Sequence, residues 1–65
     1  MSAEEMMVFF DYAQLPVNLQ IVARPFHELA ERTMTWADNS EMVVCLRKLL
    51  EARDAAFRAV AMGTK

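Results

Sequence analysis

A run of four polar residues, Asp38-Asn39-Ser40-Glu41, divides the chain into two helical patterns. Asp, Asn and Ser cap helix N-termini, because their side chains accept hydrogen bonds from the free N–H groups of the first turn. Asp38 and Glu41 also have the spacing of a capping box. The run therefore predicts a short turn between two antiparallel helices, and this turn constrains the fold more than any other feature.

The pattern after the turn predicts a helix over residues 39–61, with Gly63 as a typical residue beyond its C-terminus. Its apolar face is wide enough for two neighbouring helices, whereas a narrow stripe would satisfy one. The face comprises Met42, Val43, Leu46, Leu49, Leu50, Ala56, Phe57 and Val60. The opposite side is expected to be solvated and salt-bridged. It carries Arg47, Glu51, Asp54 and Arg58.

The pattern before the turn predicts a helix over residues 16–37. Pro16 suits its first turn, where the missing N–H costs nothing. Pro25 lies in its interior, where a proline removes a hydrogen bond and clashes with the preceding turn, so we expect a kink at residues 24–25. Beyond the kink, residues recur at helical spacing on one face. They are Phe26, Leu29, Ala30, Thr33, Met34 and Ala37.

Residues 1–15 form an arm ahead of the first helix. Its apolar segment, residues 6–12, is too short for a stable isolated helix, and one helical turn or a strand-like tail both fit it. Such a segment needs cover, so we expect it to pack on its own subunit or on a neighbour. The expected fold is all-α: a two-helix antiparallel hairpin with a Pro-kinked first helix and an N-terminal arm, in one domain of residues 1–65.

Size and composition favour self-association. A chain of 65 residues buries a limited core, and small folds usually need disulfides, a metal or a partner. Cys45 has no second cysteine to pair with, and Cys45 and His27 alone cannot build a structural zinc site. We expect Cys45 to be a small buried hydrophobe. Because 55% of the residues are hydrophobic, the excess apolar surface predicts a homo-oligomer.

Hydropathy and charge disfavour several kinds of partner. No apolar run approaches the roughly 18–20 residues of a membrane span, and the acidic start does not resemble a secretory signal. These features predict a cytoplasmic protein with no membrane partner. The net charge of −2 disfavours binding to nucleic acid. Residues 1–41 hold two basic and seven acidic residues, a net charge of −5, and residues 42–65 hold five basic and two acidic residues, a net charge of +3. This uneven charge suits self-assembly or a small anionic ligand.

The sequence offers no residue set suited to catalysis. His27 is the only candidate base at neutral pH, and it lies one turn from Glu31, which is a common surface pair. Gly63 is the only glycine, so there is no glycine-rich phosphate loop. We therefore expect a protein that is not an enzyme and that uses no cofactor and no metal.

Aromatic and basic residues remain as candidate ligand-binding groups. Phe10 and Tyr12 lie in the arm, and Arg24 lies at the expected kink. Aromatic rings stack on nucleobases, and guanidinium groups bind phosphates through charge-assisted hydrogen bonds. Two alternatives stay open: the rings are buried as packing, or Arg24 pairs with Glu28 four residues on and stays in solvent.

Residues 40–52 resemble the second helix of a family of small phage proteins that counter CBASS and Thoeris immunity. The positions that match in register are Glu41, Leu46, Lys48, Leu49, Glu51 and Ala52. Residues 59–61 match the family's Ala-Ile-Ala ending, and Phe10-x-Tyr12 and Arg24 resemble its aromatic arm and first-helix cation. The chain departs from the family pattern at residues 55–57, which replace Trp-Ala-Asn, and at Met62, which replaces a frequent arginine.

The resemblance implies a protein that sequesters a cyclic di- or trinucleotide or a cyclic ADP-ribose type signal without degrading it. It also implies a homo-oligomer, with a hexamer as one candidate. Tyr12 would stack on a base beside Phe10, and Arg24 would hold a phosphate. Lys48 is a further candidate for binding the ligand, with a role in the subunit interface as its alternative. The competing function is a helical-hairpin oligomerisation or protein-interaction module with no nucleotide ligand.

The apolar face of the second helix generates a first prediction. Leu49→Asp places an unpaired charge on the face that the hairpin and its neighbours share, so folding and assembly should be lost together. Circular dichroism and light scattering measure the two losses. A helical, assembled Leu49→Asp protein would show that the face is wrongly assigned.

Overall fold

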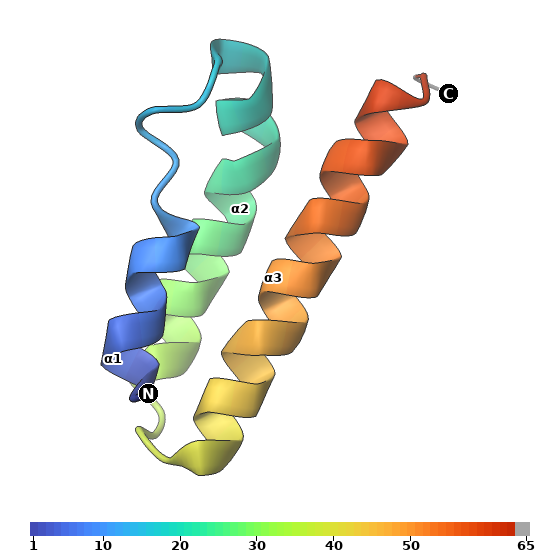
Figure 1. Cartoon of the computed structure of the whole chain (residues 1–65). Helices are drawn as coiled ribbons and strands as arrows, with labels where there is room; N and C mark the ends of the chain where they lie inside the picture. The colour runs from blue at the N-terminus through green and yellow to red at the C-terminus, as the bar shows by residue number, and fades with distance from the viewer. Residues whose placement is uncertain (64–65) are drawn as a thin grey trace.

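The computed structural model describes residues 1–63 and contains three α-helices within them: α1 (Ala3–Met6), α2 (Val17–Met34) and α3 (Ser40–Ala61). A 3-10 turn, η1 (Met7–Phe10), follows α1. These 63 residues include no strand, so the expected all-α class is confirmed. In Figure 1, α2 and α3 lie side by side and run in opposite directions, with α1 alongside them. Lys65, counted in the basic half of the sequence, lies outside the described residues.

The turn between α2 and α3 lies where the polar run predicts it, but its hydrogen bonds differ from the expected ones. Asn39 is the N-cap residue, and its Oδ1 accepts a hydrogen bond from the backbone N–H of Met42 at 3.0 Å. The expected capping box of Asp38 and Glu41 is therefore wrong, because Asp38 precedes the cap position by one residue. The Asp38 carboxylate instead accepts from the backbone N–H of Ala3 at 3.1 Å, which ties α1 to this turn.

A capping box does exist at the start of α1. The Ser2 hydroxyl accepts from the backbone N–H of Glu5 at 3.1 Å, and the Ser2 backbone N–H donates to the Glu5 carboxylate at 2.9 Å. These hydrogen bonds with the backbone and hydroxyl of Ser2 lower the pKa of Glu5. Residues 3–10 of the arm are thus helical, which decides between the two conformations that the sequence left open.

Helix α2 begins directly after Pro16 and continues through Pro25. Pro25 lacks the N–H that would donate to the carbonyl of Ile21, and the kink expected there stays a prediction. The helix ends at Met34, three residues before the expected end, because the chain turns through Thr35 and beyond. The Arg32 carbonyl in the last turn accepts from the Thr35 hydroxyl at 2.7 Å and from the Thr35 backbone N–H at 3.2 Å.

The core lies where α1 and η1 meet α2 and α3. Its buried apolar side chains come from all four elements: Ala3, Met6, Phe10, Ala30 and Leu46. Partly buried apolar residues pack around them: Met7, Phe26, Met34, Met42, Val43, Leu49 and Leu50. The arm therefore packs on its own subunit and supplies three of the five buried residues.

Three expected core residues are exposed instead. Leu29 and Val60 are exposed although both were placed on core faces, and the expectation that Cys45 is buried is wrong. Each helix packs along only one side within the chain, so its broad apolar surface is covered only in part. The C-terminal turns of α3 also diverge from α2 in Figure 1, which leaves Val60 without cover.

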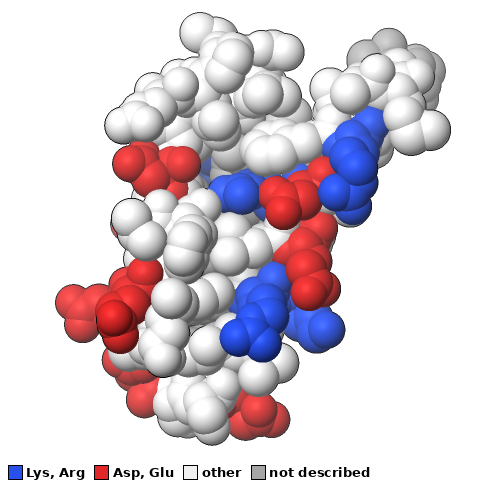
Figure 2. Space-filling view, viewed as in Figure 1, with Lys and Arg blue, Asp and Glu red and all other residues white. Residues whose placement is uncertain are grey.

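The charged side of α3 is exposed, as expected, but its ion pairs differ from the expected stripe. Glu51 pairs with Lys48 at 3.8 Å, and Asp54 pairs with Arg53 at 3.1 Å. Figure 2 shows the basic side chains of this face gathered along α3 with acidic ones among them, while the α1 side carries acidic side chains. The uneven charge of the sequence is therefore also uneven in space.

Arg53 joins the arm to α3. Its Nη1 donates to the backbone carbonyl of Phe9 at 2.6 Å, and its guanidinium lies 6.0 Å from the ring centre of Phe10 and 5.4 Å from that of Phe57. Its Nε and Nη2 both donate to Asp54. The side chain is only 16% exposed because it packs against the arm, although its hydrogen bonds lie at the surface.

The position of Arg53 generates a second prediction. Arg53→Ala should lower the free energy of unfolding by about 2 kcal/mol, since a charge-assisted hydrogen bond and two aromatic contacts are lost. Urea unfolding followed by circular dichroism measures the change. The matched control is Arg47→Ala, an exposed arginine of the same helix, with an expected change under about 0.5 kcal/mol. Equal stabilities of the two variants would contradict the role of Arg53.

Candidate functional site

Tyr12 and Arg24 line the same cavity, which has a volume of about 430 Å³. The cavity lies between the loop before α2 and the first two turns of that helix. Its other lining residues are Val17, Gln20 and Ile21. The structure thus brings together two of the four residues that the sequence suggested for a ligand site.

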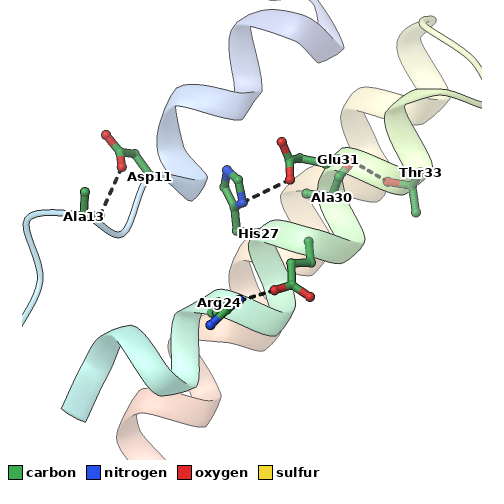
Figure 3. Close-up of polar contacts among 8 residues, drawn as sticks. Asp11, Ala13, Arg24, His27, Ala30, Glu31 and Thr33 are labelled. Atoms are coloured by element: carbon green, nitrogen blue, oxygen red, sulfur yellow. Dashed lines mark hydrogen bonds and ion pairs between the residues drawn. The ribbon is translucent and has the colours of Figure 1, made fainter. Parts of the chain in front are cut away.

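Hydrogen bonds hold the loop over residues 11–16 against α2. The Asp11 carboxylate accepts from the backbone N–H of Ala13 at 3.1 Å, as Figure 3 shows, which is a local turn typical of aspartate. The Gln20 side-chain amide donates to the carbonyls of Leu15 at 2.7 Å and Ala13 at 3.3 Å. Gln20 therefore fixes the loop that carries Tyr12 and also lines the cavity itself.

The ring of Tyr12 is oriented by a contact with α2. It packs edge-to-face on His27, with ring centres 5.3 Å apart and an angle of 71° between the planes. His27 is itself held by Glu31, whose carboxylate lies 3.4 Å from Nδ1 (Figure 3), so the expected His27–Glu31 pair is confirmed. The half-buried tyrosine ring is packed on one side and lines the cavity on another, as a preformed stacking surface requires.

Arg24 is paired but accessible. Its Nε donates to the Glu28 carboxylate at 2.8 Å (Figure 3), and its side chain is 67% exposed. This is the exposed pair that the sequence allowed as an alternative role. Such pairs contribute only about 0.3–0.5 kcal/mol, and a guanidinium has five N–H donors, of which this bond uses one. The pair therefore leaves Arg24 able to bind an anion.

The other two suggested residues do not reach this cavity. Phe10 is 1% exposed and belongs to the core beneath Arg53, so its ring is not available to a ligand. Lys48 lies on α3, is exposed, and pairs with Glu51. The alternative reading of the aromatic arm, burial as packing, thus holds for Phe10 and not for Tyr12.

A second cavity has a volume of about 350 Å³, and His27, whose ring contacts Tyr12, is one of its lining residues. It is lined by Met7, His27, Glu31, Met34 and Thr35. The Glu31 carboxylate makes it unfavourable for an anionic ligand, whereas the first cavity is lined by the cation Arg24 and by no carboxylate. The first cavity is therefore the stronger candidate for an anion.

The residues described by the structure contain no cluster of three or more His, Cys, Asp or Glu side chains placed to hold a metal ion. None of the helices within residues 1–63 has the length and apolarity needed to cross a membrane. In comparisons with known proteins, no family model matches the chain, and no curated protein and no solved structure matches it significantly.

Sequence reasoning missed three of the five residues that line the cavity. Val17, Gln20, Ile21 and Arg24 have the i, i+3, i+4, i+7 spacing of one helix face. This spacing was available in the sequence and would have grouped Gln20 and two apolar neighbours with Arg24. The hydrogen bonds from Gln20 to the loop depend on the loop's path, which no local pattern predicts.

Proposed function

We propose that the protein binds and sequesters a cyclic oligonucleotide or cyclic ADP-ribose type signal without cleaving it, as the phage family that it resembles does. The observation that supports this function is the joint placement of Tyr12 and Arg24 on one cavity. Such a protein would act in the cytoplasm of the infected cell.

The chemistry of the cavity suits one nucleotide unit. Tyr12 offers a ring to a base, and Arg24 offers charge-assisted hydrogen bonds to a phosphate. The NH2 group of Gln20 is bonded to the loop, so Gln20 offers its side-chain oxygen as an acceptor. The volume of about 430 Å³ falls within the usual range for small-molecule sites. A whole cyclic dinucleotide carries two bases and two phosphates, so one open cavity of this kind contacts only part of it.

Self-assembly therefore belongs to the proposal. Removing a signal at nanomolar concentration requires a binding free energy of roughly −12 kcal/mol. An open cavity on one subunit provides few contacts, and a site completed by a second copy of the hairpin provides more. The exposed apolar residues of α2 and α3 give such copies a surface on which to meet.

The five lining side chains also suit binding without turnover. They include no serine, cysteine, histidine or carboxylate that would serve as nucleophile or general base toward a phosphodiester. We therefore propose that the protein is not an enzyme.

A helical module that binds another protein is the second candidate. The exposed side chains of Ile21 and Trp36 favour it, because large apolar residues at a surface mark protein contacts. A thermal-shift panel of cyclic di- and trinucleotides and cyclic ADP-ribose isomers separates the two functions. A ligand at 100 times its dissociation constant adds about 2.7 kcal/mol to a folded state that alone binds it, whereas the protein-binding module responds to none.

The third prediction concerns the two residues that carry the proposal. Arg24→Ala should weaken binding of the best ligand from the panel by about 2 kcal/mol or more, because a charge-assisted phosphate contact is lost. Tyr12→Ala should weaken it by about 1–3 kcal/mol through lost stacking, and Tyr12→Phe should retain most of the affinity. Isothermal calorimetry measures all three.

Arg32→Ala is the matched control, since Arg32 is an exposed arginine of the same helix that does not line the cavity. Its ligand affinity should equal that of the wild type. An Arg24→Ala protein with unchanged affinity and slightly lower stability would leave Arg24 only its surface pair with Glu28.

The fourth prediction concerns turnover. Ligand released by heating after long incubation with the protein should be chemically identical to the ligand added, because sequestration leaves every phosphodiester bond intact. Mass spectrometry of the released ligand measures this. A linear or hydrolysed product that accumulates with time and protein concentration would overturn the non-enzymatic proposal.

A further inference from the structure

Helix α2 carries a stripe of exposed apolar residues along its outer side. Val17 is 74% exposed, Ile21 70% and Leu29 42%, and Pro25 between them is also exposed. Trp36, in the turn that follows the helix, is 67% exposed. Val17, Ile21, Pro25 and Leu29 are spaced by four and form one row along the helix. Trp36 lies beyond the end of the helix, in the turn that follows it.

This row, the outer stripe, lies opposite the face that α2 buries. The buried residues of the helix are Ala23, Ala30 and Thr33. At about 100° per residue, the centre of the outer stripe is turned well over a right angle from the centre of that face. The other elements of residues 1–63 therefore cannot cover the stripe without unpacking the core.

We infer that a second copy of this chain covers the outer stripe, with α2 packed antiparallel on α2 of the partner subunit about a two-fold axis. The apolar residues suit this symmetry. Ile21 and Leu29 lie four residues on either side of Pro25, so an axis at Pro25 sets Ile21 of each chain against Leu29 of the other.

The charges beside the stripe select a second copy over an unrelated partner. Arg24 and Glu28 flank the stripe on one side and pair with each other at 2.8 Å. A two-fold axis perpendicular to the helices places the same flank of each helix side by side, with the two chains running in opposite directions. Arg24 of each chain then faces Glu28 of the partner subunit. The midpoint between Arg24 and Glu28 is residue 26. It differs by one residue, or about 1.5 Å along the helix, from Pro25, the midpoint between Ile21 and Leu29. Apolar and charged patterns thus agree on one register.

This inference rests on the self-assembly in the proposed function and adds which surface and which symmetry carry it. It does not depend on the identity of the ligand. Val17 and Ile21 belong to the stripe and also line the ligand cavity, whereas Leu29 and the adjoining Trp36 do not line it. Variants at Leu29 and Trp36 therefore test the interface without changing a cavity residue.

Trp36 makes the interface directly observable, because it is the only tryptophan in the chain. In the ligand-free wild-type protein, dilution should release the partner, expose Trp36 to water and move its fluorescence to longer wavelength, while light scattering shows the mass fall. Leu29→Lys should give the diluted spectrum and the lower mass at every concentration. Ala55→Lys, on the exposed outer side of α3, is the control and should behave as the wild type.

Mixing two charge variants tests the register. Arg24→Glu and Glu28→Arg each place like charges across the axis and should associate more weakly than the wild type. Mixed together, they face opposite charges and should form a heterodimer, detected by native mass spectrometry, although each chain still carries like charges within itself. Failure of the mixture to associate, while Leu29→Lys still disrupts assembly, would overturn the two-fold antiparallel register.

Two further outcomes separate this inference from the proposed function. An assembly that survives Leu29→Lys and is lost in Ala55→Lys would place the interface on α3 and overturn the inference while self-assembly stands. A wild-type monomer at all concentrations would overturn self-assembly and the inference together, whereas the thermal-shift panel still decides on ligand binding by the monomer.

Discussion

The guanidinium of Arg53 is the contact on which the architecture of the chain depends. A four-residue helix such as α1 has no stability of its own, so the arm must be held by tertiary contacts. Arg53 reaches from the middle of α3 to the carbonyl of Phe9, and its cation lies between the rings of Phe10 and Phe57. The arm docked in this way delivers Phe10 to the core and sets the start of the loop that carries Tyr12.

Asp38 holds the other end of the arm through Ala3. The contacts of Asp38 and Arg53 show which features the sequence predicts and which it does not. Local spacing in the sequence predicts the turn and both long helices. It also predicts which side of α3, the side with Leu49, packs inward. The spacing of Asp38 and Glu41 predicts a capping box, but Asp38 instead bonds to Ala3, which is 35 residues away. The partner of Arg53 is 44 residues away. Contacts between such distant residues depend on how elements dock, which no local pattern records.

The candidate site divides in the same way. Tyr12 and Arg24 lie close in sequence, and the short loop and first turns of α2 bring them to one cavity. Phe10 is only two residues from Tyr12, yet the docked arm turns it into the core. The tyrosine hydroxyl disfavours full burial of Tyr12, whereas Phe10 has no polar group, but side-chain chemistry alone does not say which of the two rings reaches the core. The two rings differ in position because Phe10 packs in the core beneath Arg53, whereas Tyr12 packs on His27.

Arg24 connects the two surfaces that the fold leaves open on α2. It lines the cavity, pairs with Glu28, and borders the outer stripe through the same guanidinium. In the proposed complex, a phosphate in the cavity would share the Arg24 guanidinium with Glu28, and the proposed second copy would bring another carboxylate to it. Any ligand that engages Arg24 must therefore change the strength of the α2–α2 contact, and reciprocity requires that assembly change ligand affinity by the same factor. Four N–H donors remain on Arg24 after the bond to Glu28. If both proposals hold, Arg24 would bind a phosphate and a carboxylate together, and ligand binding and assembly would strengthen each other.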